Sequence, residues 1–472
     1  MGLQDDIVYL VLLLTSIALG AVFQRIERAH HRRSFSTLCG LLMVGLVSGW
    51  HAFFCVLAYG VQVLCIQILP WTCLHIVSFW VQMMLLVCFR LCHWVGLPNV
   101  PAHANPIIMM LTLKLIGLAF EIHDTEKLEL EIKSTENADE VETKKLQLKW
   151  KGINPSLTDT FHYAFGYTGI LTGPYFKFRT FNDLYSTSFG QLEDCTRQTL
   201  TRISRVPIYI ALFLLSGYLF PLKVVEEEDF YEKTSLLYRV FYMTPVFFNF
   251  RMRLYTGFVL SECSCIMAGL GMYPKSSEPR PGNGPTQLEA LENASSTSNG
   301  TEDMNFESVH NIDEYGADFV PTMREALRTW NMTVQYWLAN IVYRRFPMKT
   351  LRTAAVMIVS SMWHGVHPGY YLSLGSVPLV LIVEDLYDRI VRRKLSQKGQ
   401  ATYDWLSWFY RMQQFSYLGM AFQLLKIGET LTFWHSIAYL GHLILPIIYL
   451  LGLFIVKPLF SSRQAIENKK ID

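Results

Sequence analysis

Long apolar runs recur along the whole of this chain and constrain its fold more than any other feature. The run from Ile7 to Phe23 is continuous, and the stretch from Phe35 to Phe89 is broken only near Trp50-His51 and Pro70-Trp71. A helix needs about 20 consecutive apolar residues to cross a bilayer. In lipid, only a helix or a closed barrel satisfies its own backbone hydrogen bonds. The repeated runs predict an all-α, polytopic integral membrane protein with about eleven transmembrane helices.

The composition agrees with this fold class, since 51% of the residues are hydrophobic and 17% are charged. Charged residues make up about a quarter of an average soluble domain. The net charge of +2 comes without a basic block interleaved with aromatics, so we expect no nucleic-acid partner. Arginines follow the first apolar run, and the positive-inside rule therefore predicts a lumenal N-terminus.

Two polar stretches, at about 124–151 and 275–311, interrupt the apolar pattern. The first is rich in acidic residues and lysines and predicts a solvated, mobile loop. The second is rich in Gly, Pro and Ser and predicts a disordered linker. We expect one domain over residues 1–472, with these two loops and a cytoplasmic tail at about 457–472. The tail ends in Lys469-Lys470-Ile471-Asp472, which resembles a dilysine retrieval signal of the endoplasmic reticulum.

Two polar residues in apolar surroundings are the main candidates for chemistry. His364 lies between two apolar runs, where an ionisable side chain is costly and usually functional. Its imidazole is suited to proton exchange near neutral pH. From this position alone, a hydrogen bond to a neighbouring helix is an equally good interpretation. Asn331 opens a second helical segment and shares a helix face with Gln335, four residues later.

Basic residues also occur inside aromatic or apolar sequence. Lys177 and Arg179 alternate with aromatics after a glycine-rich segment, Gly166 to Tyr175, that is too broken for a plain spanning helix. They suit either phosphate binding or anchoring at the membrane interface, and physical reasoning favours anchoring. Arg251 and Arg253 separate two apolar runs, which we expect to be two spans, and should face a water-filled or anionic space.

Lys114 lies inside the apolar run from Pro106 to Phe120, so this run should face protein rather than lipid.

Several enzyme classes do not fit these residues. The histidines form no spaced metal-binding boxes, because Pro368-Gly369 break the helix after His364 and His367, so we expect no metal. The nine cysteines lie mostly in apolar runs and should be reduced. No Gly-x-Ser-x-Gly elbow is present. The remaining candidates, which are His364, Asn331 and the basic-aromatic segments, suit acyl transfer from a thioester to an alcohol without a covalent intermediate. A lipid or solute transporter with His364 as a proton relay is the competing class.

The segments Trp330-Asn331-Met332-Thr333 and Trp363-His364-Gly365 resemble the paired Asn and His motifs of the membrane-bound O-acyltransferase family. Residues 169–176, 250–253 and 363–371 are similar to the phospholipid-remodelling members of that family. The resemblance implies helices that enclose a reaction chamber. It implies that His364 is the general base for the glycerol hydroxyl of a lysophospholipid. Asn331 would orient that hydroxyl or His364, or stabilise the oxyanion.

The same resemblance implies the substrates. Acyl-CoA would be a co-substrate that arrives from the cytoplasmic side, with no bound cofactor. The acceptor would be lysophosphatidylinositol from the membrane, and the preferred acyl group polyunsaturated, typically arachidonoyl. Another headgroup or a protein acceptor remains an alternative within the enzyme class. The candidate substrate contacts are Trp330, Trp363, Gln335, Arg251, Arg253, Lys177 and Arg179.

Overall fold

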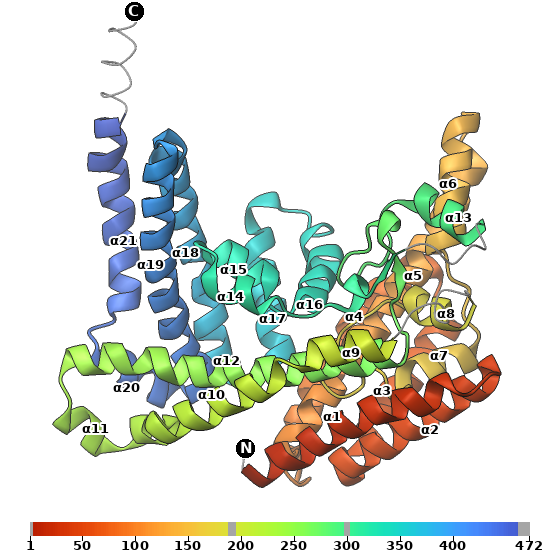
Figure 1. The fold of residues 1–472 in the computed structure, drawn as a ribbon, viewed down its shortest axis with the longest axis horizontal. Helices are drawn as coiled ribbons and strands as arrows, with labels where there is room; N and C mark the ends of the chain where they lie inside the picture. The colour runs from red at the N-terminus through yellow and green to blue at the C-terminus, as the bar shows by residue number, and fades with distance from the viewer. Residues whose placement is uncertain (1–2, 187–194, 297–302, 461–472) are drawn as a thin grey trace, which may run out of the picture. The chain divides into compact units, whose positions relative to one another are not determined.

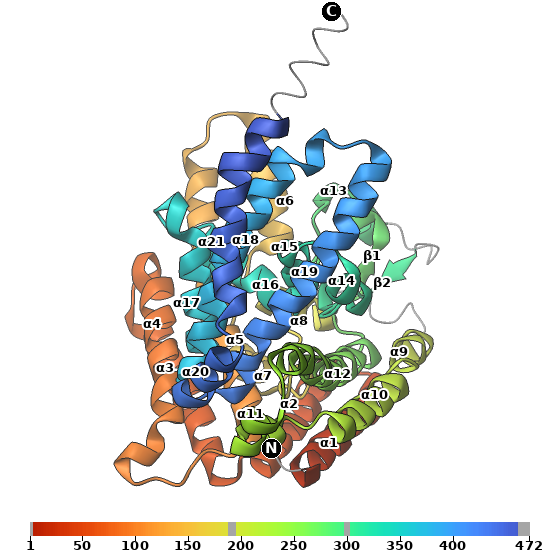
Figure 2. The same cartoon turned by 90° about the vertical axis from the view of Figure 1, so that its left-hand side faces the viewer.

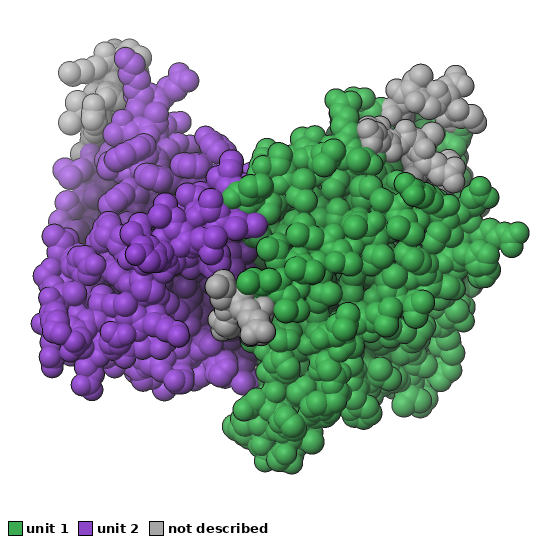
Figure 3. Space-filling model, turned by 60° about the horizontal axis from the view of Figure 1, so that its bottom comes forward, with its two compact units in different colours: residues 1–207, 255–312, 331–345 green, residues 208–254, 313–330, 346–472 purple. Residues whose placement is uncertain are grey.

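The computed structural model describes residues 3–186, 195–296 and 303–460, and these are almost entirely helical (Figure 1). They form two compact units, each assembled from separate parts of the chain (Figure 3). Unit 1 comprises residues 1–207, 255–312 and 331–345. Unit 2 comprises residues 208–254, 313–330 and 346–472. Each unit is made of separate stretches of one chain, so the units are not successive domains along the sequence. The expected single domain over 1–472 stays a prediction.

Unit 1 contains most of the N-terminal half. Its elements are α1 (Leu3–Gln24), α2 (Ala29–Ser48), α3 (Ala52–Ile68), α4 (Trp71–Arg90), α5 (Asn105–Ser134), α6 (Ala138–Lys151), α7 (Leu157–Phe165), α8 (Phe178–Ser186), α9 (Cys195–Ile203), α13 (Leu288–Ser296), α16 (Met332–Trp337), and the paired strands β1 (Tyr273–Pro274) and β2 (Met304–Asn305). A π-helical turn, Leu338–Tyr343, continues α16. Helix α5 is the core of this unit, because nearly every side chain from Ile107 to Phe120 is buried.

Lys114 lies within this buried part of α5 and is fully shielded from solvent. Its ammonium lies 3.4 Å from the carbonyl oxygen of Tyr163, 3.3 Å from that of Thr168, and 4.6 Å from the ring centre of Phe176. A buried cation needs such partners to offset its lost hydration. The expectation that this run faces protein is therefore confirmed.

Unit 2 is built around long C-terminal helices. Its elements are α10 (Val206–Leu219), α11 (Glu228–Lys233), α14 (Glu314–Phe319), α15 (Met323–Thr329), α17 (Arg352–His364), α18 (Pro368–Ile390), α19 (Gln397–Leu424), α20 (Ile427–Ser436) and α21 (Leu440–Leu451). Helix α12 (Leu236–Met267) begins in this unit and ends in unit 1. Helices α18, α19 and α21 lie side by side in both views (Figures 1 and 2) and bury a shared apolar core with α12 and α20.

The all-α, polytopic class is confirmed. Among the described residues, seven helical segments are long and apolar enough to cross a membrane: 6–24, 29–68, 71–90, 102–134, 195–226, 368–394 and 440–460. The two spans predicted on either side of Arg251 and Arg253 form the single helix α12. Helix α17 has 13 residues, too few to cross alone at about 1.5 Å per residue.

The polar stretch 124–151 is helical, so the predicted mobile loop is wrong. It forms the C-terminal third of α5 and all of α6. The Asn137 side chain caps α6 by accepting the amide of Asp139 at 3.0 Å. Lys144 lies 2.9 Å from Glu140, one turn earlier. Charges at this spacing support an exposed helix, which composition alone does not distinguish from a solvated loop.

The stretch 275–311 is also more ordered than predicted. Its described residues include α13 and β2, and β2 pairs with β1 just before the stretch. Ser277, Leu291 and Val309 are buried, and the amide of Gly282 donates to the carbonyl of Ser308 at 2.8 Å. Glycines supply the left-handed turns, with a φ of 70° at Gly282. Tertiary contacts therefore replace the disorder that the composition predicts.

Two further predictions concern irregular or terminal segments. The prediction that the glycine-rich segment from Gly166 to Tyr175 is no plain spanning helix is confirmed. The segment is a buried connection between α7 and α8. Lys457–Phe460, the described start of the predicted tail, continues the last helical segment. Lys469-Lys470-Ile471-Asp472 lies outside the described residues.

Candidate functional site

His364 is the last residue of α17 in unit 2. Gly365 ends the helix, and its amide donates to the carbonyl of Ser361 at 2.9 Å. Pro368 then starts α18, as is typical of proline in the first turn of a helix. At Gly369, an added Cβ would lie 2.2 Å from the carbonyl oxygen of Ala421, so only glycine lets α18 approach the end of α19 here. This close packing fixes the connection that follows His364.

Aromatic rings surround the imidazole of His364, which is half-buried. Its ring centre lies 4.8 Å from that of Trp363, 4.9 Å from Phe422 and 5.8 Å from Tyr370. The contacts with Trp363 and Phe422 are edge-on, a favoured geometry for aromatic pairs. Rings on several sides restrict the orientation of the imidazole and limit its contact with water.

Two of these rings, those of Tyr370 and Phe422, belong to a larger group in unit 2, which we call the aromatic cluster: Phe247, Phe250, Trp330, Tyr370, Phe415 and Phe422. The ring of Trp330 lies 6.0 Å from Phe415, which lies 4.8 Å from Phe247. Phe247 and Phe250 are 6.1 Å apart, and Phe250 is 5.7 Å from Phe422. The structure thus brings Trp330 and Trp363, both predicted as substrate contacts, into the same unit and the same apolar environment as His364.

Asn331 follows Trp330 and is the first residue of the last segment of unit 1. It precedes α16 in a left-handed conformation, with φ 46° and ψ 53°. Asparagine tolerates this region better than most residues. Within the described structure its side chain makes no capping hydrogen bond to α16. Its carbonyl instead accepts the amide of Gln335 at 3.0 Å. Asn331 and His364 belong to different units, so their meeting in one reaction chamber stays a prediction.

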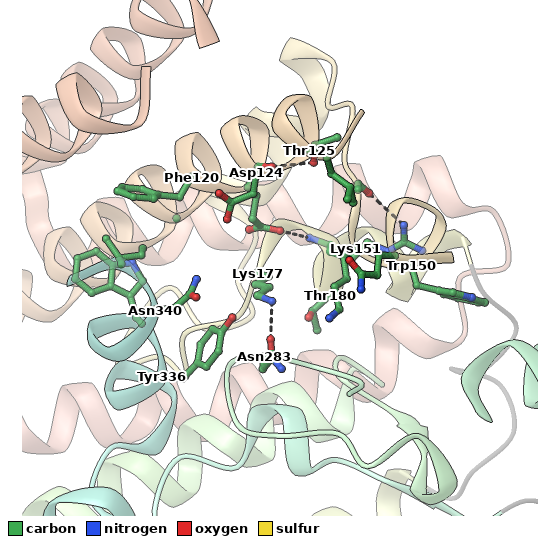
Figure 4. Close-up of a pocket in the computed structure, with 18 of the residues that line it drawn as sticks. Phe120, Asp124, Thr125, Trp150, Lys151, Lys177, Thr180, Asn283, Tyr336 and Asn340 are labelled. Atoms are coloured by element: carbon green, nitrogen blue, oxygen red, sulfur yellow. Dashed lines mark hydrogen bonds between the residues drawn. The ribbon is translucent and has the colours of Figure 1, made fainter. Parts of the chain in front are cut away.

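Unit 1 also contains a cavity of about 400 Å³ (Figure 4). Its walls come from α5, α6, the segment 175–180, the turn at Asn283, and α16 with its π-helical continuation. Lys177 points toward Asn283 and donates to its side-chain oxygen at 2.7 Å, and its ammonium lies 5.1 Å from the ring centre of Tyr336. Partial desolvation and the like charge of Lys177 lower the pKa of Lys151 in the same wall. Two nearby cations favour an anion between them.

The carboxylates of this cavity are already engaged. Glu121 accepts the amides of Phe178 at 2.8 Å and Arg179 at 3.1 Å. Asp124 lies 2.6 Å from a guanidinium nitrogen of Arg345. The charge of Glu121 also acts on Lys177, but both acids are held by these other partners, so Lys177 is the candidate for a ligand phosphate.

Arg179 has a structural role that the sequence did not indicate. Its Nε lies 2.8 Å from Asp183, and its Nη1 donates to the carbonyl oxygens of Lys149 at 2.7 Å and Gly152 at 3.2 Å. The guanidinium therefore ties α8 to the end of α6. Arg179 lines the cavity, but its charge is balanced by Asp183, so its predicted contact with substrate stays a prediction and we take forward Lys177 alone as a phosphate contact.

Arg251 is likewise paired. Its buried Nε lies 3.0 Å from a carboxylate oxygen of Asp318, and its guanidinium lies 5.1 Å from the ring centre of Phe247. The expected anionic surroundings of Arg251 are thus the protein's own aspartate. Arg253 is half-buried in the same helix, and Gln335 is half-buried in α16. Their predicted contacts with substrate stay predictions.

Two cavity residues were missed by the sequence reasoning. Lys151 ends the charged stretch that was interpreted as a loop, so nothing marked it. Asn283 lies in Pro281-Gly282-Asn283-Gly284-Pro285, which signals a tight turn. That signal places Asn283 in a turn without indicating what it faces.

Comparison with known proteins identifies the family. The model of the membrane-bound O-acyltransferase family matches residues 48–425, most of the chain. The chain belongs to the membrane-bound O-acyltransferase family. The resemblance carried by the Asn331 and His364 motifs is thereby confirmed, and both residues lie inside the matched region. Membership makes this protein an O-acyltransferase, so the transporter alternative is dropped.

Curated relatives cover almost the full length of this membrane-bound O-acyltransferase. The Mus musculus protein named membrane-bound acylglycerophosphatidylinositol O-acyltransferase MBOAT7 is 37% identical over 440 residues, which are 93% of this chain and 91% of the relative. The Drosophila melanogaster protein frj, with the same descriptive name, is 33% identical over 473 residues, 98% of this chain and 94% of the relative. The Danio rerio protein is 34% identical over 95% of this chain and 94% of its own length.

Proposed function

We propose that this enzyme transfers an acyl group from acyl-CoA to the free glycerol hydroxyl of lysophosphatidylinositol. We further propose a preference for polyunsaturated chains such as arachidonoyl, and a place in phospholipid remodelling at the endoplasmic reticulum membrane. One observation carries the headgroup: relatives named acylglycerophosphatidylinositol O-acyltransferases are 33–37% identical over more than nine-tenths of their length. The acyl preference and acyl-CoA rest on the motif resemblance.

The proposed reaction needs one base and one hydrogen-bond donor. The lysolipid oxygen attacks the thioester carbonyl carbon while His364 removes its proton. The new C–O bond forms, the C–S bond breaks, and the imidazolium returns the proton to the departing CoA sulfur. Asn331 donates to the developing oxyanion or orients the hydroxyl. Such a base contributes roughly two to four orders of magnitude, and one oxyanion donor about two to three.

The aromatic surroundings of His364 support this role. Rings on three sides leave the imidazole half-buried. A site that limits the entry of water protects the thioester from hydrolysis. It also strengthens electrostatic interactions with the transition state.

The cavity of unit 1 is proposed to take a phosphate of acyl-CoA. At about 400 Å³ it has the size of an ordinary ligand pocket. Lys177 is held there by Asn283 and Tyr336, and Lys151 adds a second cation. Lysine binds phosphate well as a point charge.

The cavity assignment predicts a selective effect of Lys177→Ala. The KM for acyl-CoA should rise about tenfold or more, since a hydrogen bond to a charged group contributes about 1.5–3 kcal/mol. The KM for lysophosphatidylinositol should stay unchanged. Lys398→Ala, at an exposed position in α19, is the control and should behave as wild type. Initial rates across an acyl-CoA series measure this; an unchanged KM for acyl-CoA would contradict the assignment.

Competition between lysolipids tests the proposed function. Purified enzyme receives lysolipids with inositol, choline, ethanolamine and serine headgroups together, with arachidonoyl-CoA or palmitoyl-CoA. Mass spectrometry of the products should show phosphatidylinositol as the main product and arachidonoyl-CoA as the better donor. Release of free CoA thiol should match product formation. Faster consumption of another headgroup would reject the inositol assignment, and product formation without thiol release would reject acyl-CoA as donor.

A further inference from the structure

A chain of buried hydrogen bonds in unit 1 ends beside Asn331. Thr333, two residues later, has no solvent exposure. Its hydroxyl donates to the side-chain oxygen of Asn311 at 2.6 Å and accepts the backbone amide of Tyr175 at 3.0 Å. Both hydrogen-bonding functions of this hydroxyl are thus used in holding the start of α16 against other parts of the unit.

Asn311 holds the same turn through its backbone. Its carbonyl oxygen accepts the amide of Met332 at 2.7 Å. Met332 is the first residue of α16, and the first amides of a helix have no partner inside the helix. Asn311 therefore fixes both residues that directly follow Asn331, one through its main chain and one through its side chain.

Asn311 is itself anchored by an ion pair between the buried Glu262 and the partly buried Arg202. Its backbone amide donates to one carboxylate oxygen of Glu262 at 2.7 Å, and that oxygen also accepts the backbone amide of Ile312 at 3.0 Å. The other oxygen of Glu262 lies 2.6 Å from Nε of Arg202, whose Nη2 donates to the carbonyl of Ile312 at 2.8 Å. All these groups belong to unit 1. The network reaches from α9 through α12 to the turn before α16.

This arrangement departs from the usual way in which a helix begins. An N-cap asparagine normally uses its side chain to accept an amide of the first turn. Asn331 adopts a left-handed conformation instead and leaves the cap unmade within the described structure. Such a conformation persists when the surrounding contacts determine it. Here Asn311 and Thr333 supply those contacts, so the helix does not need the side-chain amide of Asn331 as its cap.

We propose that Thr333 and Asn311 are positioning residues, which hold the turn so that the side chain of Asn331 is presented to the reacting groups. The proposal rests on the catalytic role assigned to Asn331. A buried polar network is a weak source of stability, because well-packed apolar residues often do as well. Its value lies in fixing one geometry, and a shift of about 1 Å can cost roughly a hundredfold in rate.

The first test is kinetic. Thr333→Val keeps the shape but removes the hydroxyl, and should lower kcat about tenfold to a hundredfold, with both KM values unchanged. Thr333→Ser keeps the hydroxyl and should restore most of kcat. Thr112→Val is the matched control, since Thr112 is also buried in unit 1 but its hydroxyl, among the described residues, bonds to the carbonyl of Ile108 in its own helix. This control should turn over as wild type.

A double-mutant cycle separates positioning from general stability. If Thr333 acts through Asn331, Thr333→Val should cause no further loss in an Asn331→Gly background, because the group it positions is gone. An equal loss in both backgrounds would overturn the proposal. If Asn331→Gly lowers kcat and Thr333→Val does not, the positioning role alone fails. If Asn331→Gly keeps full activity, the catalytic role of Asn331 fails and the proposal with it.

Thr333→Val leaves the backbone amide of Tyr175 without its acceptor and could therefore fold poorly. A second variant tests the proposal without that change. Asn311→Ala removes the acceptor of the Thr333 hydroxyl but lets that oxygen keep the Tyr175 amide. The same cycle with Asn331→Gly applies. The proposal is supported if Asn311→Ala lowers kcat in the wild-type background but causes no further loss in the Asn331→Gly background. A wild-type kcat, or an equal loss in both backgrounds, overturns it.

Discussion

Replacing His364 by Ala should reduce acyl transfer to lysophosphatidylinositol by about a hundredfold to ten-thousandfold, the usual contribution of a general base. The imidazole ends α17 in aromatic surroundings, with Trp363, Phe422 and Tyr370 around it. Removing it would take away the proposed proton acceptor for the attacking hydroxyl. The change leaves the other residues of the proposed site in place, so the loss should fall on kcat. Release of CoA thiol and formation of phosphatidylinositol by purified enzyme measure it.

His435→Ala is the matched control for this experiment. His435 also lies in unit 2, in α20, but is exposed. It should retain wild-type turnover, which shows that loss of a histidine from this unit does not by itself inactivate the enzyme. Thermal unfolding of both variants checks that the apolar core is intact. A His364→Ala enzyme that acylates lysophosphatidylinositol near the wild-type rate would reject the base assignment.

Asn331→Gly should lower kcat by about two to three orders of magnitude, as expected for the loss of one hydrogen-bond donor to an oxyanion. Glycine is the informative substitution because φ is 46° at this position. Glycine adopts that conformation without strain, so the change removes the side chain and spares the turn. KM for both substrates should change little, since the interaction belongs to the transition state.

Asn331→Ala gives the useful comparison. Alanine loses the same amide but must also adopt the left-handed region, which costs roughly 1–2 kcal/mol. We expect the alanine variant to be as slow as the glycine variant and less stable to heat. If glycine preserves kcat while alanine abolishes it, then the turn matters and the amide does not, and the catalytic role of Asn331 is wrong.

Part of the fold follows from local sequence patterns. The apolar runs predicted a helical membrane protein because a bilayer leaves the backbone few other ways to satisfy its hydrogen bonds. Lys114 in such a run predicted burial against protein, and its ammonium is enclosed by two carbonyls and an aromatic ring. The polar helices of 124–151 were missed, because their stability comes from charge spacing and caps that composition does not register.

The sequence likewise indicated some residues of the candidate site and missed others. His364 and Asn331 stood out because polar groups are costly in apolar sequence, and short motifs around them carried the family resemblance. Arg251 stood out for the same reason, yet the structure pairs it with Asp318. The cavity around Lys177 was not predictable, since Lys151 and Asn283 reach it from segments more than a hundred residues apart in the chain.

By itself, the sequence determined the class of the protein and its family, and it marked His364 and Asn331 as candidates for catalysis. These depend on hydrophobicity and on short motifs, which are properties of neighbouring residues. Only the tertiary structure decided which charges line a cavity, which are paired within the protein, and which residues hold the Asn331 turn. Those outcomes depend on hydrogen bonds and ion pairs between distant segments, such as Asn311 with Thr333 and Arg202 with Glu262, and sequence periodicity contains no information about them.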